Sequence, residues 1–201
     1  MNEKKNIYNL SYLRYQLNRS PLRKWVRGFY LKNILNNVLG RAVDFGCGAG
    51  ELLELLGEGS LGFEINEEAV RYCKEAGFNV MLWDKGSPND LFSSFEQAVF
   101  STFILNHVLE HIDDPHKFIM SVFEGCAQKG FKRIIIIVPG MKGFKNDPSH
   151  MHFIGPEFFK KLSAEPNADF TVKKQRFFPL NAVWAGNIFT HNESVIIFDR
   201  K

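Results

Sequence analysis

The chain has 201 residues, of which 45% are hydrophobic and 23% charged, and its formal net charge at pH 7 is +3. This length and composition fit one compact domain with its own core. The longest apolar run, over residues 134–138, is far too short to cross a bilayer, and the first residues lead into no apolar stretch. We therefore expect a soluble, untargeted protein.

The cysteine content is low. Cys47, Cys73 and Cys126 are an odd set without CxxC spacing, which indicates neither a disulfide framework nor a zinc knuckle. This usage favours a reducing environment, and we predict a cytoplasmic location.

The basic residues are concentrated at the start of the chain. Residues 1–40 hold eight of the 25 Lys and Arg residues but one of the 22 acidic residues. Such an arm could contact nucleic acid, an anionic membrane surface or a phosphorylated substrate. Apolar residues also recur there at helical spacing, and Ser20-Pro21 is a helix start signal, so we favour helices that dock on the body. We predict an N-terminal helical arm or cap over residues 1–40 and a catalytic domain over residues 41–201.

From residue 41 onward, short apolar segments alternate with amphipathic ones. This pattern is typical of a mostly parallel sheet covered by helices on both faces. The predicted strands are 42–45, 61–64, 79–83, a segment ending near 105, 133–138, 170–178 and 194–199. The predicted helices are 49–56, 67–76, 114–125 and 156–162, with a short irregular or helical piece over 90–98. Residues 139–156 and 179–193 are predicted as long loops, and the second has a length typical of functional loops.

A glycine-rich turn follows the first predicted strand, in the segment Val43-Asp-Phe-Gly-Cys-Gly-Ala-Gly50. Gly46 and Gly48 allow a sharp turn and a close approach of the backbone to a ligand, and the helix that follows offers free N–H groups. Glu64 ends the second predicted strand, where a carboxylate can accept hydrogen bonds from ribose hydroxyls. Together these features predict a site for an adenosine-containing cofactor.

The charges around this turn discriminate between cofactors. A dinucleotide-binding loop has a third glycine where this chain has Glu51, whose charge would repel a pyrophosphate. S-adenosyl-L-methionine carries no phosphate, and its sulfonium and amino groups suit the nearby Asp44. A methyltransferase is therefore favoured over an NAD(P)-dependent oxidoreductase. A non-catalytic scaffold of the same fold is the other alternative, and the intact set of binding residues argues against it.

These motifs resemble the class I S-adenosylmethionine-dependent methyltransferases, in particular a small-molecule branch with a VLEH segment after the fourth strand, here Val108 to His111. The resemblance implies an α/β, Rossmann-like, doubly wound fold with seven strands in the order 3-2-1-4-5-7-6, the seventh antiparallel. One departure is Phe100-Ser101, where relatives commonly have an acid after the aromatic residue. The implied cofactor-binding residues are Asp44, Gly46, Cys47, Gly48, Glu64, Ile65, Asp84 and Asn106.

The acceptor side of the site is predicted from histidines. His107, His150 and His152 are candidate catalytic residues, because an oxygen or protonated nitrogen acceptor needs a general base. Each could instead make a structural hydrogen bond. Glu110 and His111 could hold a divalent ion, but we expect local structural roles and no metal. We expect a small or medium acceptor, such as a sugar, a lipid precursor or a metabolite. Nucleic acid is disfavoured because the body is acidic, whereas membrane contact by the arm stays open.

Overall fold

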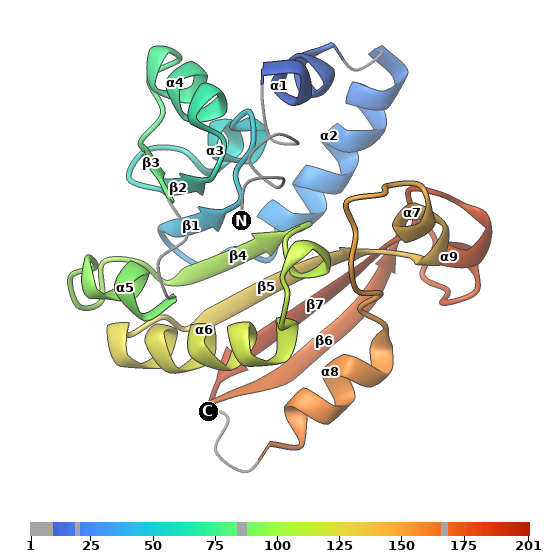
Figure 1. Ribbon diagram of the computed structural model, residues 1–201. Helices are drawn as coiled ribbons and strands as arrows, with labels where there is room; N and C mark the ends of the chain where they lie inside the picture. Colours follow the sequence, from blue (N-terminus) through green and yellow to red (C-terminus); the bar gives the residue numbers. More distant parts are fainter. Residues whose placement is uncertain (1–9, 19–20, 84–87, 166–168) are drawn as a thin grey trace.

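A seven-stranded sheet forms the centre of the molecule (Figure 1). The computed structural model describes residues 10–18, 21–83, 88–165 and 169–201. The strands are β1 Ala42–Phe45, β2 Leu61–Glu64, β3 Val80–Leu82, β4 Thr102–Asn106, β5 Arg133–Pro139, β6 Phe170–Phe178 and β7 Glu193–Arg200. Their order is β3-β2-β1-β4-β5-β7-β6, with β1 to β5 parallel and β7 antiparallel to both of its neighbours. The predicted fold class and strand order are confirmed.

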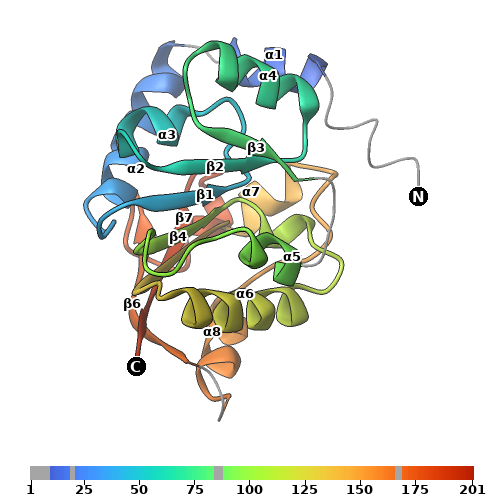
Figure 2. The same ribbon diagram turned by 90° about the vertical axis from the view of Figure 1, so that its left-hand side faces the viewer.

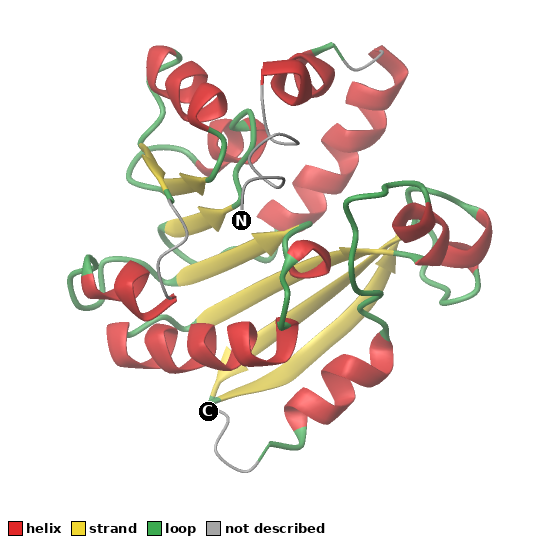
Figure 3. Ribbon diagram, viewed as in Figure 1, coloured by secondary structure: helices red, strands yellow, loops and turns green. Residues whose placement is uncertain are grey.

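Helices cover both faces of this sheet (Figure 2), and Figure 3 separates them from the strands by colour. They are α1 Leu10–Leu17, α2 Pro21–Leu35, α3 Glu51–Leu56, α4 Glu67–Glu75, α5 Pro88–Ser93, η2 Leu109–His111, α6 Pro115–Lys129, α7 Met141–Lys145, α8 Pro156–Ser163 and α9 Ala185–Ile188. Helices α5, α6 and α8 pack on one face, whereas α2 and α3 pack on the other. Among the described residues, no helix has the length and apolar character that a membrane span requires.

Strand β5 divides the hydrophobic core into two layers. Ile134, Ile136 and Val138 face the cluster beneath α5, α6 and α8, whereas Ile135 and Ile137 face the cluster beneath α2 and α3. Successive side chains of a strand point to opposite faces, so an uninterrupted apolar run serves both layers. Each fully buried aliphatic side chain contributes about 1.5–3 kcal/mol relative to an exposed one. The central position of β5 therefore follows from its composition.

Two element boundaries differ from the prediction for reasons visible in the structure. Helix α6 passes through Gly125 and ends at Lys129, where Gly130 adopts φ 82°. Gly125 lies inside the helix and does not end it. A glycine is needed there for packing, because a Cβ atom would lie 2.1 Å from the Phe92 ring. Because Gly125 has no side chain, Phe92 of α5 can pack closely against α6. Helix α3 begins only at Glu51, since Gly50 has φ 79° and belongs to the preceding turn.

The second N-terminal helix is part of the core. Tyr30, Leu31 and Ile34 of α2 are buried against the face of the sheet formed by β1, β4 and β5. Arg133 of β5 donates a hydrogen bond from Nη1 to the carbonyl of Asn37, at 2.9 Å. The helical spacing in this part of the sequence thus corresponds to a docked helix. The two predicted loops also contain the short helices α7 and α9.

Candidate active site

The glycine-rich turn between β1 and α3 is held in a conformation that favours glycine. Gly46, Gly48 and Gly50 have φ values of 80°, 55° and 79°. A Cβ atom at Gly46 would lie 2.6 Å from Cγ2 of Val108. The backbone N–H groups of Gly46 and Cys47 both donate to the Phe63 carbonyl, at 2.8 and 3.0 Å. The turn is therefore attached to β2 on one side and to the segment after β4 on the other.

A large cavity opens at the carboxyl ends of the parallel strands, beside this turn. Its volume is about 2220 Å³, compared with about 300–1,000 Å³ for a typical small-molecule site. Ligands of open α/β sheets bind at this edge. One wall consists of the glycine-rich turn and the end of β2, and the other comes from segments near residues 106–114, 139–151 and 178–193. The cavity has room for two ligands side by side.

Asp44 is a buried carboxylate on the wall formed by the glycine-rich turn and the end of β2. Its side chain is 1% exposed, and its Oδ1 atom has no hydrogen-bond partner among the residues that the structure describes. Burial raises the pKa of Asp44 to about 7, Arg27 opposes this rise, and Glu64 adds to it. An unsatisfied buried oxygen at a cavity wall is suited to a positively charged ligand group.

Glu64 lies at the tip of β2, beside the turn. Its carboxylate accepts hydrogen bonds from the backbone N–H groups of Gly48, Ile65 and Asn66, at 2.7, 2.8 and 2.9 Å. Burial raises the pKa of Glu64, and these three hydrogen bonds oppose the rise. The side chain is thus oriented at the cavity wall before any ligand binds, in the position that the sequence predicts.

Most of the other predicted cofactor residues line the same cavity, and one lies outside the described residues. Cys47, Ile65 and Asn106 line the cavity together with Asp44, Gly46, Gly48 and Glu64. Asn106 accepts a hydrogen bond at Oδ1 from the Tyr30 hydroxyl. The structure therefore gathers these seven residues around one cavity, six at the glycine-rich turn and the end of β2 and Asn106 at the end of β4. Asp84 lies outside the described residues.

The N-terminal helices bring residues to the cavity that sequence reasoning missed. Gln16 of α1 accepts a hydrogen bond from the Ala49 N–H at 3.0 Å. Arg27 of α2 pairs with Glu51 and lies over the Tyr30 ring, with its guanidinium carbon 5.8 Å from the ring centroid. Helical periodicity could place these residues on one helix, but the face that meets the glycine-rich turn depends on how α2 packs. No motif in the sequence marks them.

His107 is clamped between two carboxylates. Its Nδ1 atom lies 3.1 Å from Oε1 of Glu110, and its Nε2 atom lies 2.7 Å from Oε2 of Glu193. Burial lowers the pKa of His107, but the two carboxylates outweigh burial and raise it to about 10. A pKa raised in this way favours the protonated imidazole, which has no lone pair to accept a proton. His107 lines the cavity, but the two carboxylates beside it favour a positioning role over a general base, and the catalytic role stays a prediction.

The two histidines after α7 point in different directions. His150 lines the cavity, and its Nδ1 atom lies 2.9 Å from the Phe144 carbonyl. His152 is exposed, bonds the Asp113 carbonyl through Nε2 at 3.0 Å, and is absent from the cavity lining. A side chain turned away from the cavity cannot receive a proton from a ligand inside it. The geometry thus argues against His152 as a base.

Comparison of the sequence with known protein families identifies the family of this chain. Residues 12–140, more than half of the chain, match the family described as a methyltransferase domain. The chain belongs to this family. It is a class I S-adenosylmethionine-dependent methyltransferase, and S-adenosylmethionine is its cofactor, as predicted. The family assignment decides against the oxidoreductase and scaffold alternatives. None of the curated proteins matches the sequence significantly.

Solved structures share the fold of this methyltransferase at low sequence identity. A SAM-dependent methyltransferase from Archaeoglobus fulgidus has a TM-score of 0.68 at 23% identity, covering 89% of this chain and 94% of that one. The N-methyltransferase NodS from Bradyrhizobium japonicum, in complex with S-adenosyl-L-homocysteine, has a TM-score of 0.62 at 14% identity, covering 92% and 91%. Magnesium protoporphyrin IX methyltransferase from Synechocystis, with bound SAH, has a TM-score of 0.60 at 14% identity, covering 92% and 89%. At these identities the likeness shows the fold alone.

Proposed function

We propose that this methyltransferase acts on a small or medium acceptor, such as a sugar, a lipid precursor or another metabolite. The observation that carries the proposal is one cavity with two kinds of lining. The glycine-rich turn and the end of β2 form one wall, here called the cofactor wall, and the segments that hold His107 and His150 form the other. Its volume of about 2220 Å³ leaves space beside the cofactor for such an acceptor. Two of the similar structures support this class, since one is named for methylation of magnesium protoporphyrin IX and another is an N-methyltransferase.

The residues of the cofactor wall fit S-adenosylmethionine. In our assignment, the unpartnered oxygen of Asp44 receives the positive methionine end, and Glu64 binds the ribose hydroxyls. Ile65 contacts the adenine, and Asn106 lies near the transferred methyl group. We assign the remaining contacts to the backbone of Gly46 and Gly48, to Cys47 and to Asp84.

When bound, the cofactor supplies a methyl group that its sulfonium already activates. The chain's own task is therefore to align the acceptor with that group and to exclude water. Alignment of two reactants can supply about 7–11 kcal/mol of the barrier reduction. We assign His107 a positioning role, because it holds Glu110 and Glu193 on the acceptor side. We keep His150 on that side as a residue that contacts the acceptor region.

We further propose that residues 1–40 act as a cap over the cofactor. Gln16, Arg27 and Tyr30 support this role, since each contacts the glycine-rich turn, the start of α3 or Asn106. The basic charge of this segment is compatible with peripheral contact to an anionic membrane. Because α2 is part of the core, its deletion would unfold the domain, and single substitutions such as Tyr30→Phe test the cap instead.

Calorimetry tests the cofactor assignment. We expect micromolar binding of S-adenosylmethionine and S-adenosylhomocysteine, no binding of NADH, and loss of adenosyl-ligand binding in Asp44→Ala and Glu64→Ala. Glu58→Ala, on the exposed turn after α3, is the matched control and should bind as the wild type does. Tight binding of NADH without a response to either adenosyl ligand would overturn the assignment.

Release of S-adenosylhomocysteine in the presence of acceptor panels tests the acceptor class. We expect turnover with hydroxylated or amine-bearing metabolites and none with nucleic acid. Turnover with RNA or DNA alone would contradict the small-acceptor proposal while leaving the cofactor assignment intact.

A further inference from the structure

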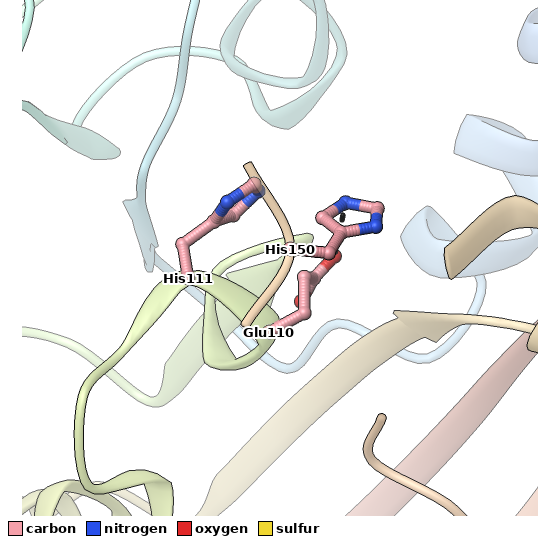
Figure 4. A group of neighbouring side chains, drawn as sticks. All are labelled: Glu110, His111 and His150. Carbon is pink, nitrogen blue, oxygen red and sulfur yellow. Dashed lines mark ion pairs between the residues drawn. The ribbon is translucent and has the colours of Figure 1, made fainter. Parts of the chain in front are cut away.

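Three potential metal ligands converge on the acceptor side of the cavity. Glu110 and His111 lie on η2, and His150 lies in the segment after α7 (Figure 4). The backbone carbonyl of Glu110 accepts hydrogen bonds from the N–H groups of Met151 and His152, at 2.8 and 3.3 Å. These two bonds attach the segment after α7 to η2. His150 is thereby held beside a carboxylate that is distant in the sequence.

Both imidazoles contact backbone carbonyls through Nδ1. In His150, Nδ1 lies 2.9 Å from the Phe144 carbonyl, and in His111 it lies 3.2 Å from the Ser149 carbonyl. The Ser149 hydroxyl donates to Asp147 and therefore offers no proton to His111. Because a carbonyl only accepts, each Nδ1 is the donor of its hydrogen bond, and Nε2 is the ring nitrogen that could coordinate a metal. Metal-binding histidines are oriented in this way.

Glu110 supplies an oxygen that no described residue satisfies. Its side chain is fully buried, Oε1 bonds Nδ1 of His107, and Oε2 has no hydrogen-bond partner among the described residues. A buried carboxylate oxygen without a partner is unfavourable, and a cation removes this cost. The hydrogen bond from His107 also orients the carboxylate, as outer partners of metal ligands do.

The distances are close to those of a metal site. One potential ligand atom from each of the three side chains lies within 4.8 Å of the other two. Nε2 of His150 lies 3.9 Å from Oε1 of Glu110, the oxygen that also bonds His107 and belongs to the same carboxylate as Oε2. Ligands of a zinc ion lie about 2.0–2.2 Å from it and so about 3–3.5 Å from one another. The three ligand atoms would therefore have to approach one another by up to about 1–2 Å to complete the set.

We propose that Glu110, His111 and His150 bind one divalent transition-metal ion, such as Zn²⁺, Mn²⁺ or Co²⁺. Two imidazole nitrogens and one carboxylate oxygen suit these ions better than Mg²⁺ or Ca²⁺, which prefer oxygen ligands. Three protein ligands leave coordination positions open, and His111 and His150 both line the cavity. The open positions would take an oxygen of the acceptor, which narrows the proposed acceptor class to molecules with a hydroxyl or carboxyl group at the reacting end.

The expectation of a metal-free site considered only Glu110 and His111, which are adjacent in the sequence. The third ligand comes from a segment without periodicity, and only the fold brings it close. The acceptor part of this inference rests on the proposed function. The binding of the ion does not, since it is measured without cofactor or acceptor.

Metal content and the visible spectrum of Co²⁺ test the proposal on the full-length protein. After dialysis against chelator and reloading, we expect one equivalent of Zn²⁺ and a Co²⁺ absorption stronger than that of the hydrated ion, which Zn²⁺ displaces. His150→Gln and Glu110→Gln should each weaken Zn²⁺ binding by at least about tenfold. His152→Gln is the matched control, because this exposed histidine is two residues from His150 and outside the cluster, and it should bind as the wild type does.

The possible outcomes are distinct. Stoichiometric Zn²⁺ that both variants retain with wild-type affinity, or a Co²⁺ spectrum identical to that of the hydrated ion, would overturn the metal site. Because Glu110 is buried, the folding of its variant is checked by circular dichroism, and His150→Gln provides the decisive comparison if that variant unfolds. Failure of S-adenosylmethionine binding in the separate calorimetric experiment would contradict the proposed function but not the metal site.

Discussion

Asp44 is the residue on which the electrostatics of the cofactor wall depend. It is buried, and the charged groups that influence it are Arg27 and Glu64. Burial raises its pKa to about 7, so the carboxyl group changes charge within the physiological pH range. A positively charged ligand binds the ionised form better, because the ion pair offsets the cost of a buried charge.

We therefore expect the affinity for S-adenosylmethionine to rise by about tenfold between about pH 6 and pH 8, as Asp44 with its pKa of about 7 loses its proton. Calorimetry across this range measures the change. Asp44→Asn cannot ionise, and should bind weakly with little pH dependence. A variant that keeps the pH dependence of the wild type would assign the titration to another group.

Gly46 offers a second test at the level of one residue, because both its backbone and its neighbour exclude a side chain. With φ 80° and a Cβ position 2.6 Å from Val108, Gly46→Ala should lower stability by more than the roughly 1–2 kcal/mol of the left-handed conformation alone. It should also abolish cofactor binding. Gly57→Ala is the control, since Gly57 has φ 75° but no described atom within 4 Å of its Cβ position. If the two substitutions changed the denaturant midpoint and the cofactor affinity equally, the contact with Val108 would not matter at Gly46.

At the scale of elements, close packing of α5 on α6 overrides helix propensity. Gly125 lies inside α6, where alanine would favour the helix by about 1 kcal/mol. The Phe92 ring occupies the space that an alanine side chain would need. A glycine within a predicted helix thus marks a helix contact here, whereas Gly130 ends the helix with φ 82°.

Gly125→Ala should destabilise the protein by about 1–3 kcal/mol, because overpacking outweighs the gain in helix propensity. Gly28→Ala in α2 is the matched control: no described heavy atom lies within 4 Å of its Cβ position, and the substitution should stabilise by about 0.5–1 kcal/mol. Chemical denaturation of both variants measures the difference. A stabilising effect of Gly125→Ala would show that α5 can move away at little cost.

At the scale of the whole molecule, one ion-pair network connects segments from both ends of the chain. Arg133 of β5 donates to Asp199 of β7 at 2.6 and 2.9 Å and to the Asn37 carbonyl after α2. Lys173 of β6 also donates to Asp199, at 2.7 Å. The hydrogen bond from Arg133, and secondly that from Lys173, hold the pKa of Asp199 below its usual value although partial burial opposes this.

A carboxyl group with a lowered pKa stabilises the folded state above its unfolded-state pKa, and this contribution disappears as pH falls through the folded-state value. We therefore expect Asp199→Asn to destabilise the protein at pH 7 and to approach the stability of the wild type as pH falls below about 4. Urea unfolding at several pH values measures this convergence. Asp169→Asn, on the exposed segment before β6, is the control and should show a smaller effect at pH 7. A pH-independent difference for Asp199→Asn would contradict the assignment.

The sequence by itself determined the sheet and which residues the structure gathers at the glycine-rich turn and the end of β2. Asp44, the glycine-rich turn and Glu64 are specified by contiguous motifs at strand ends, and parallel strands place their carboxyl ends at one edge of the sheet. Local pattern and topology are therefore sufficient for this half of the cavity. The predicted helix end at Gly125 was wrong, because this glycine makes room for the Phe92 ring of α5, a contact that the sequence pattern does not show.

Only the tertiary structure decided the acceptor side. Glu193 meets His107, His150 meets Glu110, and Tyr30 meets Asn106 across long separations in the sequence. Which side chains meet depends on the rotation of α2 and on the path of segments without periodicity, and a linear pattern carries no information about either. The raised pKa of His107 follows from the same cause, since two carboxylates outweigh burial, and Glu193 is brought close only by the antiparallel β7.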